Sequence, residues 1–104
     1  MRPFILLSAP AICIELGERC KAVRLLRNLT QLQLAQMVNV SLSSIRRFEV
    51  SGQSTLEVFV KVTQALQVVQ QLEPLLTEQG LSISDLEKQQ TVQKRRRARN
   101  RARL

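Results

Sequence analysis

Apolar residues recur at intervals of three and four positions along the first quarter of the chain. The members of this stripe are Ile12, Leu16, Cys20, Val23 and Leu26. The spacing predicts a helix from Pro10 to about Arg27, since Pro is favoured in a first helical turn. Gly17 disfavours a helix, so close packing is its expected reason. Asn28 is expected to end the helix in a left-handed conformation, which Asn tolerates better than other non-glycine residues.

Two short helices are predicted next, within residues 30–49, and each start carries a capping signal. Thr30 is a good N-cap and Gln33 completes a capping box, while Ser41 caps the second helix of the pair. Asn39 stands where the first of these helices must stop and the chain reverse, which again favours positive φ. Two helices joined by three or four residues form a helix-turn-helix, a unit able to enter a DNA groove.

The apolar pattern gives this helix pair an inward and an outward face. Ala35 is small enough for close helix crossing, and four larger residues face inward: Leu34, Val38, Ile45 and Phe48. The outward residues of the second helix are Leu42, Ser43, Arg46 and Arg47. We interpret these four as candidate base readers, since Leu42 suits a thymine methyl and Arg46, in preference to Arg47, suits guanine. The alternative is packing on a partner for Leu42 and solubilising charge for the two arginines.

A fourth helix is predicted from conflicting local signals. Ser54 and Glu57 form a further capping box, although residues 58–60 are strand formers. A stripe at helical spacing decides for the helix, and its members are Leu56, Phe59, Thr63 and Leu66. The apolar pattern continues to Leu76, with Pro74 either starting a new helical turn or kinking the existing one.

The chain therefore divides into four predicted segments. Residues 1–9 form an apolar arm, irregular or extended, which packs on a partner subunit as an arm or edge strand. Residues 10–78 form the helix-turn-helix domain, and residues 79–93 hold a short helix from Asp85 to about Gln93. Residues 94–104 are expected to be a disordered basic tail, because they have no apolar period with which to fold.

Positive charge is concentrated in this tail. The net charge is +8, but residues 1–90 hold nine basic and eight acidic residues, and 9 − 8 leaves only +1. The seven remaining cations are Lys94, Arg95, Arg96, Arg97, Arg99, Arg101 and Arg103. Such a tail favours polyanions such as nucleic acid and accelerates association. The alternative is a solvated tail that mainly keeps the protein soluble.

Size and composition limit the remaining chemistry. A chain of 104 residues holds one small domain plus a tail, and so small a core is often completed by dimerisation. Cys13 and Cys20 lie two helical turns apart, too far for a disulfide, and are expected to be reduced core or interface residues, with redox sensing as the alternative. With no His and two Cys, the chain cannot build a closed zinc site alone.

We expect no metal, no cofactor, no catalytic residue and no enzymatic activity, since neither a glycine-rich phosphate loop nor a spaced carboxylate pair is evident. No apolar run approaches the roughly 20 residues of a membrane span, so we expect a cytoplasmic protein without membrane contact.

Several short motifs add a family resemblance over residues 12 to about 70. They are Leu16-Gly17-Glu18-Arg19, Val23-Arg24, Asn28-Leu29-Thr30-Gln31, Leu34-Ala35, Val40-Ser41, Ile45, Phe48-Glu49 and Gly52. Together they resemble the Cro/repressor (XRE) helix-turn-helix family. The following residues, Leu72-Glu73-Pro74-Leu75-Leu76, then Ser82 to Leu86, Gln89 and the arginine-rich end, are similar to HipB-like regulators that accompany HipA-type kinase toxins.

The resemblance implies an all-α fold: a compact five-helix Cro/repressor-like domain, usually dimeric on a palindromic operator, here followed by the short helix and basic tail. It implies that Gln31 and Ser44, with the cap residue Ser41, contact DNA phosphates. It also pairs Arg24 with Glu49, which would tie the first helix to the recognition helix. The alternative for this pair is a surface ion pair worth under about 1 kcal/mol.

Three departures weaken the transfer from this family. Asn28 and Asn39 replace the family's usual glycines, and the loop Val50 to Thr55 lacks a basic residue often found there. A nearly neutral domain should bind a polyanion weakly, because charge neutralisation supplies most non-specific affinity. Dimerisation or the basic tail must therefore supply the missing affinity for DNA.

These features predict a dimeric, sequence-specific transcriptional regulator, the autorepressing antitoxin of a HipA-like kinase toxin-antitoxin module. Its expected partners are a palindromic double-stranded DNA operator, a second copy of the chain and the kinase toxin. The alternative is a protein-interaction module that neutralises a partner without specific DNA reading. RNA binding through the tail is disfavoured, because the chain has three Phe and no Tyr or Trp for stacking on bases.

Overall fold

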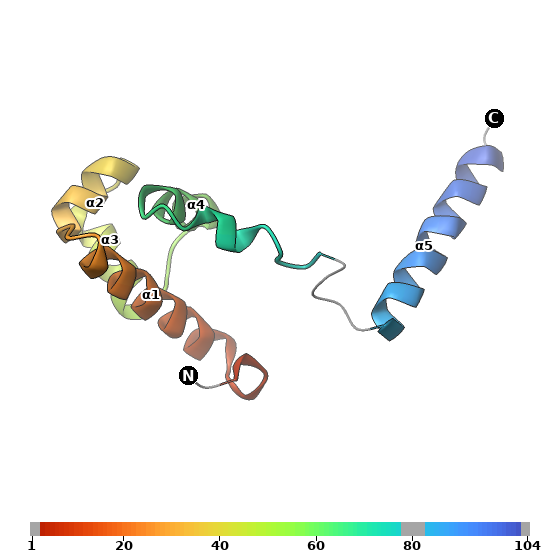
Figure 1. Cartoon of the computed structure of the whole chain (residues 1–104), viewed down its shortest axis with the longest axis horizontal. Helices are drawn as coiled ribbons and strands as arrows, with labels where there is room; N and C mark the ends of the chain where they lie inside the picture. Colours follow the sequence, from red (N-terminus) through yellow and green to blue (C-terminus); the bar gives the residue numbers. More distant parts are fainter. Residues whose placement is uncertain (1–2, 78–82, 103–104) are drawn as a thin grey trace. The chain divides into compact units, whose positions relative to one another are not determined.

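The structure, a computed structural model, describes residues 3–77 and 83–102, and within them it contains helices and no strands (Figure 1). The elements in chain order are the 3-10 helix η1 (Phe4–Leu6), α1 (Ala9–Leu26), α2 (Gln31–Val38), α3 (Leu42–Ser51), α4 (Leu56–Ala65), the 3-10 helix η2 (Val69–Leu72) and α5 (Ile83–Ala102). The all-α prediction is confirmed. The chain forms two compact units, Met1–Gln70 and Gln71–Leu104, which are described separately below.

Residues Phe4–Leu6 form a local 3-10 turn, so of the two conformations expected for the N-terminal arm, irregular or extended, the extended one is wrong for this segment. The amide of Leu6 donates to the carbonyl of Pro3 at 3.1 Å, and the amide of Leu7 donates to that of Phe4 at 3.0 Å. These bonds satisfy the backbone within the segment, which removes the need for a neighbouring strand. The Arg19 guanidinium lies 4.8 Å from the centroid of the Phe4 ring and covers one side of it.

Helices α2 and α3 begin where their capping residues predict, and α2 also ends there. Thr30 Oγ1 accepts from the amide of Gln33 at 3.0 Å, and Gln33 Oε1 accepts from the amide of Thr30 at 2.8 Å, which completes the capping box. Ser41 Oγ accepts from the amide of Ser44 at 3.1 Å. Asn39 has φ of 61° and ends α2 in the left-handed region, and Asn28, with φ of 57°, does the same after α1.

Helix α4 is confirmed as a helix, but its cap lies one residue later than predicted. Thr55, not Ser54, is the N-cap, and its Oγ1 accepts from the amide of Val58 at 3.1 Å. The strand formers are overridden because the helix buries Val62 and Leu66 completely. Tertiary burial therefore outweighs local preference here.

The apolar pattern after α4 does not continue as an α-helix. Gln67 has φ of 63°, and the amide of Val68 donates to the carbonyl of Thr63 at 2.9 Å, which closes α4. The chain then forms only the four-residue η2 and turns around Pro74. A left-handed residue is the physical reason for the stop, since it reverses the chain without glycine.

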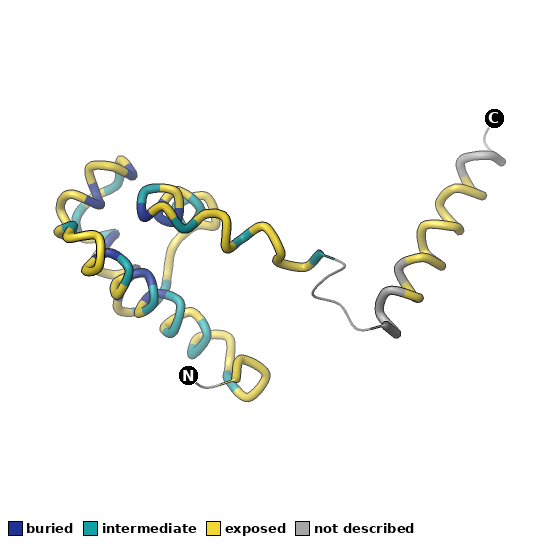
Figure 2. Tube along the Cα trace, viewed as in Figure 1, coloured by how far each residue is buried: buried dark blue, intermediate teal, exposed yellow. Residues whose placement is uncertain are grey.

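The core of the first unit lies among its four α-helices. Helix α1 packs on α3, and α2 packs on both α3 and α4 (Figure 1). Eight apolar residues are buried there: Cys20, Leu34, Ala35, Val38, Ile45, Phe48, Val62 and Leu66. Figure 2 colours all buried positions dark blue, polar ones included. The four inward residues predicted for α2 and α3 are all among them, whereas Leu26, predicted in the stripe of α1, is 81% exposed. The buried line of α1 is instead Gly17, Cys20 and Arg24.

Gly17 allows α1 to cross α3 at close range. A Cβ atom at this position would lie 2.4 Å from the carbonyl oxygen of Phe48, which is a steric overlap. Gly52 ends α3 at φ of 73°, and a Cβ there would overlap the carbonyl of Cys13 on α1. The predicted reason for Gly17 is therefore confirmed, and a second glycine fixes the same crossing.

Helix α5 is longer than predicted. It runs from Ile83 to Ala102, whereas the sequence predicted a helix from Asp85 to about Gln93 and disorder from Lys94 onward. The arginine-rich segment is therefore helical to Ala102, because Arg, Lys, Gln and Ala are all strong helix formers and neither Gly nor Pro interrupts them. Arg103 and Leu104 lie outside the described residues.

Candidate nucleic-acid interface

Helix α3 has one buried and one exposed face. Ile45, Phe48 and Glu49 are buried against the rest of the unit, with exposed fractions of 0%, 2% and 3%. The predicted outward residues Ser43, Arg46 and Arg47 are exposed, whereas Leu42 is half-buried. The structure thus brings the two cations and one hydroxyl of α3 onto a single free face, with Leu42 at its edge.

Three serine hydroxyls gather at the start of this helix. Ser41 Oγ lies 2.8 Å from Ser44 Oγ and 3.1 Å from Ser43 Oγ. Ser43 is exposed and Ser44 is half-buried, so the cluster opens to solvent at the helix N-terminus. Hydroxyls and free amides at such a terminus are the donors that a phosphate accepts from.

A buried ion pair fastens α3 to α1. Arg24 Nε donates to Glu49 Oε2 at 2.6 Å and Arg24 Nη2 donates to Glu49 Oε1 at 3.1 Å, a two-pronged contact. Arg24 Nη1 also donates to the carbonyl of Leu29 at 2.7 Å, which holds the segment before α2. The side chains of the pair are only 7% and 2% exposed, so this is not the weak surface contact considered as the alternative.

The side chain of Gln31 joins this buried group. Its Nε2 donates to Glu49 Oε1 at 2.9 Å, so the side-chain amide points into the unit. The resemblance implied a phosphate contact for Gln31, and the link to Glu49 was not predicted because no local pattern carries an interaction across 18 residues. Gln31 is also the first residue of α2, where its backbone amide has no carbonyl partner within the helix. With its side chain bonded to Glu49, Gln31 presents its backbone amide as a free donor at the start of α2.

Cys20 lies in the same buried environment on α1. Burial raises the pKa of its thiol from 9.0 to about 11, and the nearby negative charge of Glu49 adds to this effect. A thiol held protonated at neutral pH is a poor nucleophile and a poor metal ligand. Cys13 is exposed, and both cysteines are free, as the spacing predicts.

The basic residues of α5 form a separate charged surface in the second unit. The exposed cations there are Lys88, Lys94, Arg95, Arg96, Arg97 and Arg99. Arg101 lies within α5 near its end, and Arg103 lies outside the described residues. The basic character predicted for this segment is therefore carried by a helix.

Within residues 3–77 and 83–102, no group of three or more His, Cys, Asp or Glu side chains is arranged to hold a metal ion. No helix in these ranges is both long and apolar enough to cross a membrane. The exposed face of α3 therefore offers hydrogen-bond donors and positive charge.

Comparison with known proteins bears directly on this surface. Residues 21–69 match the HTH_3 family model, described as Helix-turn-helix, and this segment includes α2, α3 and α4. The chain contains a helix-turn-helix domain. The match agrees with the predicted Cro/repressor-like helix-turn-helix fold, which is confirmed, and it supports DNA-binding regulation of transcription.

None of the curated proteins compared with the chain matches it. Among solved structures, a chain of the SinR protein/SinI protein complex is similar, with 21% sequence identity and a TM-score of 0.49. The similarity covers 80% of this chain and 98% of that chain.

Proposed function

We propose that this protein is a sequence-specific DNA-binding transcriptional regulator that places α3 in the major groove of its operator. The observation that carries the proposal is the division of α3 into a buried face fixed by the Arg24–Glu49 pair and an exposed face bearing Arg46 and Arg47. A recognition helix needs both, since base contacts demand a fixed helix orientation and free donors.

The exposed side chains fit the chemistry of base edges. Arg46 and Arg47 each offer a planar guanidinium that can donate two hydrogen bonds to guanine, and the Ser43 hydroxyl can donate to or accept from several bases. Leu42, half-buried at the edge of this face, can reach a thymine methyl with the part that is exposed. These four residues are the proposed base readers.

Phosphate contacts are proposed at the N-termini of α2 and α3. The backbone amide of Gln31 and the hydroxyls of Ser41 and Ser44 lie at these two helix starts. Helix N-termini favour negative charge and present free amides, so they hold the domain on the backbone without reading sequence. These contacts set the register of α3 in the groove.

A homodimer on a palindromic operator is part of the proposal. One domain presents a single short recognition helix with two cations, which is little for tight binding to a polyanion. Two copies related by a two-fold axis double the contacts and demand half-sites about one helical turn, roughly 34 Å, apart.

The test is a comparison of Arg46→Ala and Arg47→Ala with Lys61→Ala. Lys61 is an exposed cation on α4, so its removal matches the loss of charge without touching α3. Binding sites are first selected from a random duplex library with the parent protein. The α3 variants should then lose preference at one base position by roughly 1–3 kcal/mol, while Lys61→Ala keeps the parent's preference. An equal loss for all three variants on every sequence would contradict base reading by α3.

We further propose that the regulator is the autorepressing antitoxin of a HipA-like kinase toxin. Support comes from the resemblance of residues 72–76 to HipB-like regulators and from the exposure of Leu75 and Leu76, at 62% and 93%. Ile5 and Leu6, at 93% and 77%, are also exposed. Apolar groups so open to water favour a protein partner that covers them.

The antitoxin role has its own test, because the alternative is a module that neutralises a partner without specific DNA reading. Leu75→Gln/Leu76→Gln should weaken capture of the purified kinase and leave the selected operator bound as before, with Leu32→Gln as the exposed apolar control on α2. Kinase capture by a protein that shows no preference among duplexes would favour the alternative. No capture of the kinase by the parent protein would rule out the antitoxin role.

A further inference from the structure

Helix α5 carries positive charge around its whole circumference over its second half. Successive residues of an α-helix are turned by about 100°, so the run Lys94 to Arg97 distributes four cations on all sides. Arg99 adds a fifth, and all five side chains are exposed. The helix therefore has no neutral face in this stretch.

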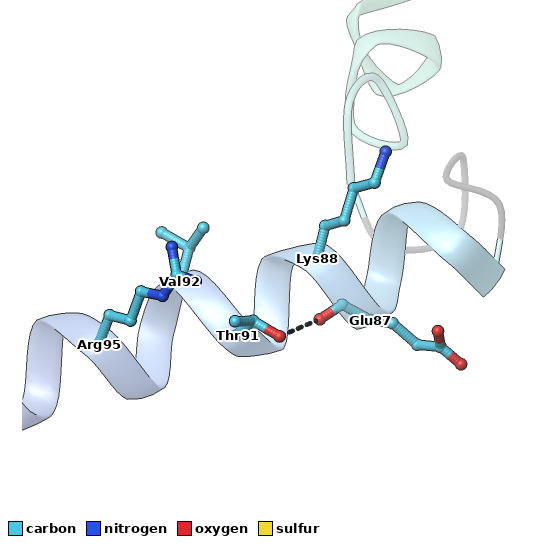
Figure 3. A pocket seen from close by; sticks show the side chains of 5 residues that line it. All are labelled: Glu87, Lys88, Thr91, Val92 and Arg95. Atoms are coloured by element: carbon cyan, nitrogen blue, oxygen red, sulfur yellow. Dashed lines mark hydrogen bonds between the residues drawn. The ribbon is translucent and has the colours of Figure 1, made fainter.

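Residues 87–92 of α5 do not supply an apolar face either. On the side drawn in Figure 3, a shallow surface hollow is lined by Glu87, Lys88, Thr91, Val92 and Arg95. The Thr91 hydroxyl donates to the carbonyl of Glu87 at 3.1 Å, so it is satisfied within the helix. Val92, itself 44% exposed, is the single apolar group there. Between residues 87 and 99, apolar anchors three or four positions apart are missing from the sequence.

This pattern selects among classes of partner. A helix that lies on a membrane surface, or in an apolar groove of a protein, needs an apolar stripe at helical spacing. A helix charged on all sides is best neutralised by a partner with negative charge on more than one side. The major groove of DNA offers this, because phosphates line both of its edges.

The dimensions agree with such a partner. An α-helix with its side chains is about 10–12 Å across, close to the roughly 12 Å width of the major groove. Charge repulsion within the helix points the same way. Lys94 and Arg97, Arg96 and Arg99, and Arg95 and Arg99 are like-charged pairs three or four positions apart, which destabilise an isolated helix. Phosphates would relieve that repulsion.

We infer that α5 is a second DNA-binding element, a basic helix that lies in a groove of double-stranded DNA and becomes most stable as a helix when DNA neutralises it. This deepens the proposed function and rests on it only in taking DNA as the ligand. It differs from a flexible basic tail, because the helical form itself contributes to affinity. It also adds cationic phosphate contacts to those proposed for the first unit at the N-termini of α2 and α3.

The experiment uses the full chain and a labelled duplex of random sequence. Ala98→Pro keeps every cation but breaks α5, while Ala98→Gln changes the same exposed position and keeps a good helix former. Ala98→Pro should weaken binding by about tenfold, whereas Ala98→Gln should bind within twofold of the parent. Far-UV circular dichroism should show added helix when the duplex binds the parent, and much less for Ala98→Pro.

A charge variant tests the other half of the inference. Replacing Arg95, Arg96, Arg97 and Arg99 by Gln preserves helix propensity and removes four cations. The slope of log K against log salt should become shallower by up to about 0.9 for each phosphate that is no longer neutralised. Equal affinity of Ala98→Pro and the parent, or an unchanged salt slope, would overturn the inference. Tighter binding of the parent to single-stranded RNA of equal length would also overturn it.

These measurements are separate from the test of α3. Random duplex is used throughout, so the result for α5 does not depend on operator preference. Conversely, Ala98→Pro should keep the parent's preference among sequences, since it leaves α3 intact. If the affinity depends on the α5 helix and on salt but the protein shows no preference among sequences, DNA binding by α5 would be supported and the proposed sequence-specific function would be rejected.

Discussion

Because the Arg24–Glu49 pair is buried, we expect the loss of one of its charges to destabilise the fold strongly. Glu49→Gln keeps the size of the side chain and removes the negative charge that faces the buried guanidinium. The carboxylate accepts three hydrogen bonds, at 2.6 and 3.1 Å from Arg24 and at 2.9 Å from Gln31. In the variant, one of the two oxygens becomes an amino group that points at these donors. At least one hydrogen bond therefore breaks, and a cation is left buried without its partner.

The size of the effect follows from burial. Removing one member of a buried ion pair typically costs about 3–5 kcal/mol. The unit Met1–Gln70 is expected to have a total stability of about 3.5–10 kcal/mol, at roughly 0.05–0.15 kcal/mol per residue. Glu49→Gln should therefore remove a large share of the folding free energy and populate the unfolded state at moderate temperature.

The assay is urea unfolding monitored by circular dichroism, together with thermal unfolding measured by calorimetry. Glu15→Gln is the control. Glu15 pairs with Arg19 at 3.2 Å, but these side chains are 23% and 38% exposed, so its loss should cost about 0.3–0.5 kcal/mol. A double variant, Arg24→Met/Glu49→Met, should be more stable than Glu49→Gln, because no buried charge remains. Similar losses of unfolding free energy for Glu49→Gln and Glu15→Gln would show that burial does not increase the contribution of the Arg24–Glu49 pair to stability.

Three further predictions follow from the close crossing, the left-handed residue and the buried thiol. Gly17→Ala should destabilise the fold by about 1–3 kcal/mol in urea unfolding, because its Cβ would overlap the Phe48 carbonyl; unchanged stability would contradict that contact. Asn39→Gly should be tolerated and Asn39→Ala should cost about 1–2 kcal/mol, since φ is 61°; the reverse order in thermal unfolding would contradict the left-handed end of α2. The pKa of Cys20 is raised from 9.0 to about 11, so the stability that this thiol confers is complete below pH 9 and is lost as pH rises toward 11. Its loss should follow about 1.4 kcal/mol per pH unit, and Cys20→Val, measured over the same pH range, should lack this dependence.

Local chemistry explains which parts of the fold can be predicted from the sequence. The two ends of α2 and the start of α3 depend on residues a few positions apart, so Thr30, Asn39 and Ser41 predict them correctly. At α4 two neighbouring hydroxyls compete for one cap, and local rules do not choose between Ser54 and Thr55. In the structure the Ser54 hydroxyl donates to the carbonyl of Thr55 at 3.0 Å, and the Thr55 hydroxyl makes the capping bond.

Longer-range features escape local rules for a different reason. The pairing of Arg24 with Glu49 joins residues 25 positions apart, and only the family resemblance suggests it. The contact from Gln31 to Glu49 carries no sequence signal. At α5, the prediction of disorder relies on the lack of an apolar face, but helix propensity alone forms the helix in the structure. Residues 87, 88 and 90–99 of α5 are exposed, so burial gives no indication of whether this part of the chain is helical.

The two faces of α3 have consequences for how such a protein diversifies. Ile45, Phe48 and Glu49 are held by the core, while Ser43, Arg46 and Arg47 take no part in it. Substitutions at the three exposed positions should leave folding almost unchanged, because exposed helix sites tolerate most residues. Duplicated copies of the gene could therefore drift toward new target sites one residue at a time, with the scaffold inherited intact.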